Sequence, residues 1–234
     1  YGRQHIIQED IDKVTEILNS DFLTQGPCVP EFEKAVCKLT NAKYSVAVNS
    51  ATSALHIACS SLGLTKNDWL WTVPNTFVAS ANCALYCNAK VDFVDIDPST
   101  YNMSLECLKA KLAKADVDGL LPKVVVPVHF SGQPCQLQEI KLLSEKYGFA
   151  IIEDASHAIG SLYNEARTGS CKYSDITVFS FHPVKIITSG EGGMATTNCP
   201  NLFQKMELLR SHGVTRDPML MKNKTFEKWE YEQI

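Results

Sequence analysis

A carboxylate stands at the end of one apolar segment of the chain. Asp154 directly follows residues 149–153, which are apolar except for Glu153. A carboxylate at the mouth of a buried strand is costly to desolvate unless a cation faces it, and a protonated pyridine nitrogen is one such cation. The same residue could instead cap a helix that follows the strand.

A lysine stands in the equivalent place after a second apolar segment. Lys185 follows residues 176–181 and has Val184, Ile186 and Ile187 beside it in the sequence. Apolar surroundings destabilise an ammonium ion and lower its pKa, and a neutral amine can form a Schiff base with an aldehyde. The alternative interpretation is an ordinary surface lysine in a loop.

Two further places suit the other parts of a phosphorylated aromatic cofactor. Thr52 and Ser53 open a predicted helix directly after a strand, where N–H groups, hydroxyls and the helix dipole favour a phosphate, although they could simply cap the helix. Phe77 follows another strand and could lie flat on an aromatic ring or pack in the core. Together these residues meet the requirements of pyridoxal 5′-phosphate (PLP). An NAD-binding Rossmann domain would need a G-x-G-x-x-G motif, which the sequence lacks.

The elements that position these residues alternate between apolar runs and helical patterns. Apolar runs predict strands at residues 44–48, 69–73, 91–96, 123–129, 149–153, 176–181 and 193–197. Apolar residues at helical spacing predict helices near residues 52–62, 105–112 and 137–147. This order predicts an α/β fold with a mostly parallel sheet flanked by helices, in which ligands bind beyond the carboxyl ends of the strands.

The composition restricts the class of protein. The 234 residues are 45% hydrophobic and 21% charged, as in a globular protein, and carry a net charge of −4, whereas a nucleic-acid-binding protein would be expected to carry a basic excess. No apolar run approaches the roughly 20 residues that span a bilayer, and residues 1–9 lack the apolar core of a signal peptide, so a cytoplasmic location is expected. Nine cysteines without a CxxC pair predict neither a metal site nor a disulfide framework.

Several motifs resemble one known family. Residues 153–160 (EDASHAIG), 179–185 (FSFHPVK) and 190–193 (GEGG) are similar to the DegT/DnrJ/EryC1/StrS sugar aminotransferases. These are fold-type-I PLP enzymes that act on nucleotide-linked keto sugars, and the resemblance runs over the whole chain. Residues 1–4, 20–27 and 77–87 further resemble the branch of the family that serves pseudaminic acid biosynthesis.

The resemblance implies a PLP-dependent aminotransferase, or transaminase. It would take the amino group of L-glutamate and transfer it to C4 of a UDP-linked 4-keto-6-deoxy-N-acetylhexosamine. A homodimer with shared active sites is implied as well, with no nucleic-acid or membrane partner. Two alternatives are an aminotransferase for another nucleotide-linked keto sugar and a non-catalytic regulator with the same fold.

Site residues follow from the same resemblance, position by position. Lys185 matches the Schiff-base lysine, Asp154 the carboxylate that faces the pyridine nitrogen, and His157 a residue beside the cofactor ring. The implied cofactor-binding residues are Thr52, Ser53, Phe77, Asp154, His157, Ser180 and Lys185. The implied nucleotide-sugar contacts are Tyr1, Asp21, Phe22, Leu23, Thr24, Ala51 and Ser180.

Residues 1–234 are expected to form the PLP-binding large domain of such an enzyme, with its N-terminal segment. The family has a smaller C-terminal domain, so the resemblance implies a chain that stops before it. The family also supplies an asparagine to the phosphate from that later part, across the dimer interface.

Overall fold

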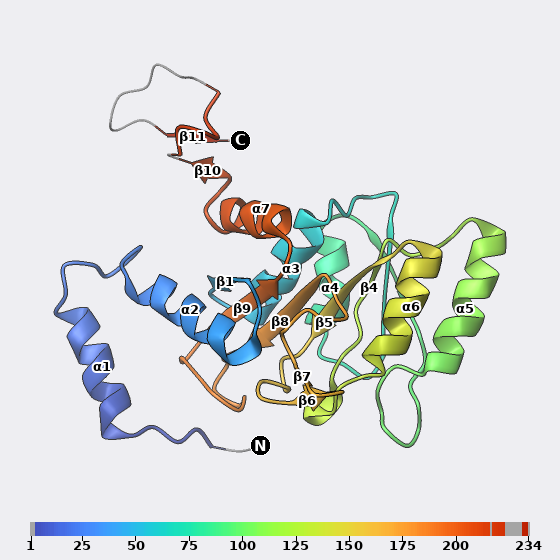
Figure 1. Cartoon of the computed structure of the whole chain (residues 1–234), viewed down its shortest axis with the longest axis horizontal. Coiled ribbons are helices and arrows are strands. Elements are labelled where there is room, and N and C mark those ends of the chain that lie inside the picture. The colour runs from blue at the N-terminus through green and yellow to red at the C-terminus, as the bar shows by residue number, and fades with distance from the viewer. Residues whose placement is uncertain (1–2, 216, 223–230, 234) are drawn as a thin grey trace.

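The centre of the structure is a seven-stranded sheet (Figure 1). The computed structural model describes residues 3–215, 217–222 and 231–233. The strand order is β1 (Tyr44–Val48), β9 (Gly193–Thr197), β8 (Ile176–Ser180), β5 (Ala150–Asp154), β4 (Val124–Val125), β2 (Trp69–Thr72) and β3 (Lys90–Phe93). The pairs within β8, β5, β4, β2 and β3 are parallel, and β9 is antiparallel to both of its neighbours. Two small two-stranded antiparallel sheets pair β6 (Leu162–Tyr163) with β7 (Ala166–Arg167) and β10 (Val214–Thr215) with β11 (Glu232–Gln233).

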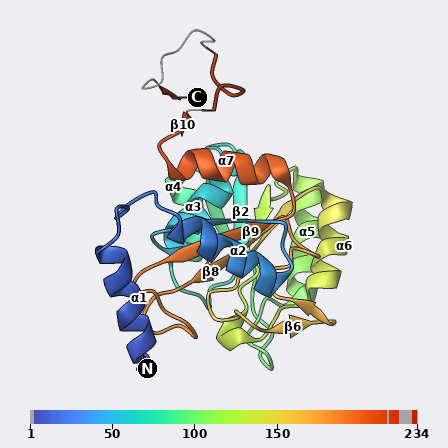
Figure 2. The ribbon, with the colours of Figure 1, turned by 60° about the vertical axis from the view of Figure 1, so that its left-hand side comes forward.

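Helices cover both faces of this sheet, so the fold has three layers (Figures 1 and 2). One face packs against α3 (Ala51–Ser61), α4 (Ala79–Tyr86) and α7 (Pro200–Arg210), and the other against α2 (Cys28–Thr40), α5 (Leu105–Asp118) and α6 (Leu137–Tyr147). Successive strand residues alternate between the two cores: Ile152 faces α3, whereas Ile151 faces α6. The first helix, α1 (Gln8–Leu18), has no buried residue and lies at the margin of the molecule. No helix among the described residues is long and apolar enough to cross a membrane.

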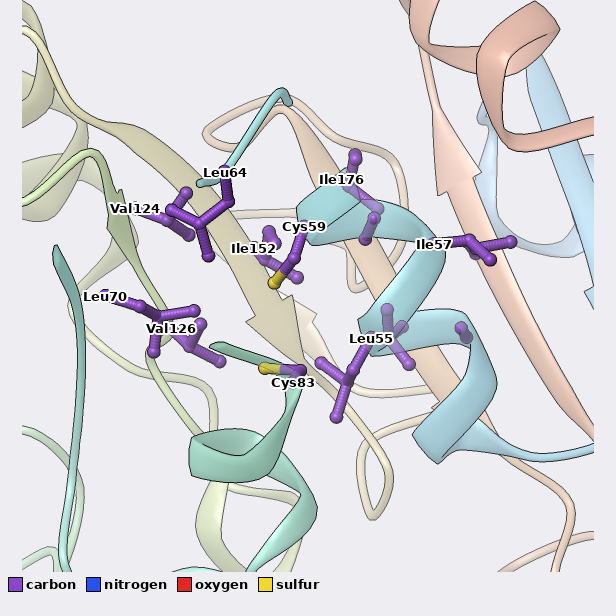
Figure 3. Close-up of a cluster of buried hydrophobic side chains, with 14 of the residues drawn as sticks. Leu55, Ile57, Cys59, Leu64, Leu70, Cys83, Val124, Val126, Ile152 and Ile176 are labelled. Carbon is purple, nitrogen blue, oxygen red and sulfur yellow. The ribbon is translucent and has the colours of Figure 1, made fainter. Parts of the chain in front are cut away.

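The core between α3, α4 and the sheet fixes where α3 begins. Figure 3 shows Leu55 and Cys59 of α3 and Cys83 of α4 beside Ile152 of β5 and Val126, which follows β4. All five side chains are fully or almost fully buried. Because α3 is anchored along this length, its first turn is held at the carboxyl edge of the sheet.

The predicted elements are present, with two differences. Every predicted strand is found, but two are shorter than predicted: β4 covers only Val124–Val125 of residues 123–129, and β3 ends at Phe93 within residues 91–96. Pro127 has no N–H to donate to the neighbouring strand, although its carbonyl accepts from Asp154 N–H of β5 at 2.9 Å. The chain then turns through the 3₁₀ helix η1 (Phe130–Gly132). The antiparallel direction of β9 was not predicted, because a strand buried on both faces has the same apolar pattern in either direction. The mostly parallel α/β fold is confirmed.

Candidate active site

Four strands bring their ends together at one edge of the sheet. Asp154 ends β5 and pairs in register with Val178 of the neighbouring β8, which ends two residues later at Ser180. Gly193 begins the antiparallel β9, and it pairs with Ser180 on one side and with Val48 at the end of β1 on the other. Residues distant in sequence therefore surround one volume beyond these strands.

The carboxylate of Asp154 is buried and fully oriented by hydroxyl groups. The residue is 5% exposed. Its Oδ2 accepts a hydrogen bond from Ser80 Oγ at 2.6 Å, and its Oδ1 accepts from the Oγ and N–H of Ser156 at 2.7 and 3.2 Å. Turns rather than a helix follow β5, so the helix-cap interpretation is wrong. No cation forms an ion pair with this carboxylate among the described residues, which leaves it ready to meet a cationic ligand.

The lysine contacts a histidine from the segment after β5. Lys185 Nζ lies 2.7 Å from His157 Nε2. Burial lowers the pKa of Lys185, opposed by the negative charge of Asp154. Burial also lowers the pKa of His157, and the positive charge of Lys185 adds to that lowering. Both shifts favour neutral groups, and a neutral imidazole can accept a hydrogen bond from the lysine.

The apolar neighbours predicted to surround Lys185 do not bury it. Val184, Ile186 and Ile187 are exposed, Ile186 to 64%. The lowered pKa comes from the partial burial of the lysine among other groups of the site. The surface-lysine interpretation does not fit either, because Nζ is engaged by His157.

The loop that carries Lys185 is closed at its base and braced at its turn. Phe181 N–H donates to Gly192 O at 2.9 Å, where the two strands separate. Lys185 N–H donates to the carbonyl of His182 at 2.9 Å, and Val184 N–H donates to the ring Nδ1 of the same histidine at 3.3 Å. His182 therefore holds the backbone on which the lysine stands.

The first turn of α3 offers unused donors. Ser50 is the N-cap, and its Oγ accepts from Ser53 N–H at 3.2 Å, while the Ser53 hydroxyl donates to Asn49 Oδ1 at 2.6 Å. Within the described part of the chain, no hydrogen bond engages the N–H groups of Ala51 and Thr52 or the Thr52 hydroxyl. These groups, together with the helix dipole, suit an anion.

A glycine allows this helix to approach the sheet edge. A Cβ on Gly193 would lie 2.3 Å from the carbonyl carbon of Ser50 and 2.5 Å from Ala51 N. Only glycine therefore permits the start of α3 to lie directly against β9, next to Ser180. The N–H donors at the start of α3 and Ser180 therefore lie on either side of Gly193, and we call this group of residues the anion cradle.

Phe77 lies in the segment between β2 and α4. Its side chain is 74% exposed, so the core-packing interpretation is wrong. The segment is tied to Asp154, because Thr76 Oγ1 lies 2.7 Å from Ser80 Oγ, and Ser80 reaches the carboxylate. The aromatic ring is thus carried on a turn that is fixed relative to the buried carboxylate.

The predicted sugar contacts divide into two groups. Ala51 and Ser180 belong to the anion cradle. The four residues between α1 and α2 are exposed, and no hydrogen bond or ion pair among the described residues joins them to Lys185 or Asp154. These four are Asp21, Phe22, Leu23 and Thr24. Tyr1 lies outside the residues that the structure describes.

Sequence reasoning missed three residues that orient the predicted ones. Ser80 and Ser156 hold the carboxylate, and His182 holds the lysine-bearing turn. Ser156 and His182 lie within recognisable motifs, because a polar side chain that accepts from a backbone N–H two residues on is a turn signal. Asp154 accepts in this way from Ser156 N–H, and His182 accepts from Val184 N–H. Ser80 gives no such signal, because it contacts Asp154 across 74 positions.

Comparisons with known proteins identify the family of this chain. Residues 4–228 match the DegT/DnrJ/EryC1/StrS aminotransferase family. The chain is 43% identical over 216 residues to a UDP-4-amino-4,6-dideoxy-N-acetyl-beta-L-altrosamine transaminase of Campylobacter jejuni subsp. jejuni serotype O:23/36 (strain 81-176), which covers 92% of this chain and 56% of that protein. The chain therefore spans about half the length of the curated relatives that it matches.

Two solved structures share the fold. Helicobacter pylori PseC, an aminotransferase involved in the biosynthesis of pseudoaminic acid, has a TM-score of 0.86 at 32% identity, covering 99% of this chain and 58% of that one. The PLP form of the putative sugar aminotransferase Spr1654 from Streptococcus pneumoniae has a TM-score of 0.84 at 26% identity, covering 100% and 60%. On the match over residues 4–228, the chain belongs to the DegT/DnrJ/EryC1/StrS aminotransferase family.

Proposed function

We propose that residues 1–234 form the PLP-binding large domain of a nucleotide-sugar aminotransferase. The amino group would come from L-glutamate and go to C4 of a UDP-linked 4-keto-6-deoxy-N-acetylhexosamine, as in pseudaminic acid biosynthesis. The observation that carries the proposal is the 2.7 Å contact of Lys185 Nζ with His157 Nε2, on residues that follow two paired strands, one of which ends at the buried Asp154. The C. jejuni transaminase and H. pylori PseC support the choice of substrate.

The residues of the site fit a phosphorylated pyridine aldehyde. The anion cradle suits its phosphate, the Asp154 carboxylate suits a protonated ring nitrogen, and the exposed ring of Phe77 suits its face. When bound, PLP supplies an aldehyde for an amine and an electron-withdrawing ring that stabilises a carbanion. The proposed cofactor contacts are Thr52, Ser53, Phe77, Asp154, His157, Ser180 and Lys185.

Lys185 would do the acid–base work. Its lowered pKa raises the share of neutral amine, which can take the proton from Cα of glutamate. In the second half-reaction the same Nζ returns a proton to C4 of the sugar. His157, whose pKa is lowered by burial and by the charged form of Lys185, orients Nζ between these transfers.

The remaining features of the proposal concern substrate and assembly. We assign the nucleotide sugar to the cradle side of the site and to the segment between α1 and α2, through Tyr1, Asp21, Phe22, Leu23, Thr24, Ala51 and Ser180. The protein would act in the cytoplasm as a homodimer with shared active sites. The exposed segment between α1 and α2 supports a role in binding a partner molecule.

An absorbance spectrum of the purified protein with PLP tests the proposal. We expect the visible band of lysine-bound PLP, which L-glutamate bleaches and D-glutamate leaves unchanged. A panel of UDP- and TDP-linked 4-keto sugars added to the bleached protein should restore the band only with the true acceptor. A protein that gives no band, or a band that L-glutamate does not change, would contradict the assignment.

A further inference from the structure

Ser80 is buried at the back of the site, and the function proposed above gives it no role. It lies on α4, is 0% exposed, and its Oγ is 2.6 Å from Asp154 Oδ2. A hydroxyl has one hydrogen, and a carboxylate at this distance is a stronger acceptor than Phe77 O at 3.3 Å. Ser80 therefore donates to Asp154.

The direction of the hydrogen bond from Ser80 to Asp154 also fixes the direction of the bond between Thr76 and Ser80. Thr76 Oγ1 lies 2.7 Å from Ser80 Oγ. Because the Ser80 hydrogen is given to Asp154, Thr76 is the donor to Ser80. Ser80 N–H also donates to Phe77 O at 3.2 Å. A continuous chain of hydrogen bonds thus runs from the turn that carries Phe77 to the carboxylate.

The two oxygens of Asp154 are left unequal by their partners. Among the described residues, Oδ1 accepts two hydrogen bonds, both from Ser156, whereas Oδ2 accepts only the one from Ser80. Each carboxylate oxygen can accept about two hydrogen bonds. Oδ2 is therefore the oxygen that can accept from a further N–H donor. Its hydrogen bond from Ser80 determines the direction from which that second donor can approach.

We propose that Ser80 is a positioning residue, which aims Oδ2 of Asp154 at the ring nitrogen of the bound cofactor and links it to the Phe77 turn. The inference rests on the proposed function, because PLP supplies that ring nitrogen. Ser80 touches neither substrate nor cofactor in this proposal and acts through Asp154. A role limited to filling the core would make no distinction between cofactors that differ at one ring atom.

That distinction provides the experiment. Apo protein is titrated with PLP and with its analogue in which the ring nitrogen is replaced by C–H, and tryptophan fluorescence gives the two dissociation constants. Their ratio isolates the contact between Asp154 and the ring nitrogen, since the phosphate and the aldehyde are common to both. The unaltered protein should prefer PLP.

We expect Ser80→Ala to reduce this preference about 10-fold, because a hydrogen bond to a charged group is lost. Ser61→Ala is the matched control: Ser61 is also buried, and its hydroxyl donates only to Ala58 O within α3. It should leave the preference unchanged. Thr76→Val, at a half-buried position, removes the donor to Ser80 Oγ, so the Ser80 hydroxyl is less polarised and donates less strongly to Asp154, and the preference should fall about 3-fold.

The outcomes distinguish a failure of the role proposed for Ser80 from a failure of the proposed function. An unaltered protein that binds neither compound overturns the proposed function and the positioning role with it. An unaltered protein that prefers PLP, with the same preference in Ser80→Ala and Thr76→Val, overturns only the role of Ser80. If Ser80→Ala does not fold, the Thr76→Val ratio decides alone, and an unchanged ratio rejects the inference.

Discussion

Asp154 ends β5 and Lys185 follows the paired strand β8, yet the chain surrounds them differently. The Asp154 carboxylate is buried and accepts hydrogen bonds from α4 and from the turn after β5. Lys185 stands on the loop between β8 and β9, beside exposed residues, and His157 is the single partner of its amine in the part of the chain that the structure describes. Three hydrogen bonds from two residues therefore fix the Asp154 carboxylate, whereas one contact holds the Lys185 amine among the described residues.

The difference matches what each group has to do. A charge that stabilises a reacting system is most effective when it is fixed in advance, because it then costs no reorganisation. A group that bonds to one partner and then moves a proton to another must change its position. Rigid burial suits the carboxylate, and a braced loop suits the amine.

The strongest test removes the mobile group. Lys185→Ala should reduce turnover by more than about 1,000-fold, because both the bond to the aldehyde and the proton transfers are lost. Pyridoxamine phosphate should still bind, since the anion cradle and Asp154 are untouched, and dialysis followed by absorbance measures it. Steady turnover by this variant would exclude Lys185 as the essential amine.

Altering the fixed group should have the next largest effect. Asp154→Asn keeps the size of the side chain but removes its charge, and turnover should fall by about 100-fold, the usual scale for one lost electrostatic contact. Stopped-flow absorbance of the glutamate half-reaction measures it. Rates equal to those of the unaltered protein would mean that the buried carboxylate is only structural.

A third test asks how firmly the loop must be braced. His182→Leu removes the acceptor of Val184 N–H, and we expect kcat to fall about 10-fold, as one lost hydrogen bond allows. His182→Asn should restore most of the rate, because an asparagine oxygen can accept from a backbone N–H two residues on. If both variants lose the same activity, the histidine acts by some property other than this acceptor.

The smallest effect is a shift in pH dependence. Burial lowers the pKa of Lys185 below the ordinary 10.5, so its labelling by an amine reagent should rise with pH and reach half its maximum below that value. Asp154 opposes this lowering, so Asp154→Asn should move the midpoint lower still. Mass spectrometry of the peptide that contains Lys185 gives both midpoints. A midpoint that rises in the variant would contradict the coupling between the two groups.

The sequence revealed the groups that do chemistry better than the groups that orient them. Asp154 and Lys185 could be predicted because each follows an apolar run at the edge where ligands bind. Ser80 could not, because a serine within an apolar helix carries no sign of a partner 74 positions away. The direction of β9 could not be predicted either, although it brings Gly193 to the anion cradle.

The placement of Gly193 has a consequence for the order in which the protein assembles. The anion cradle joins the start of α3, near residue 50, to the first residue of β9. Most strands of the sheet therefore lie, in the sequence, between the two segments that form the cradle. Contacts that close so long a loop carry an entropic cost and tend to form late in folding. During synthesis on the ribosome, β1 and α3 emerge before β9, and the anion cradle cannot form until β9 has been made. Cofactor binding therefore reports that this last central strand has been inserted.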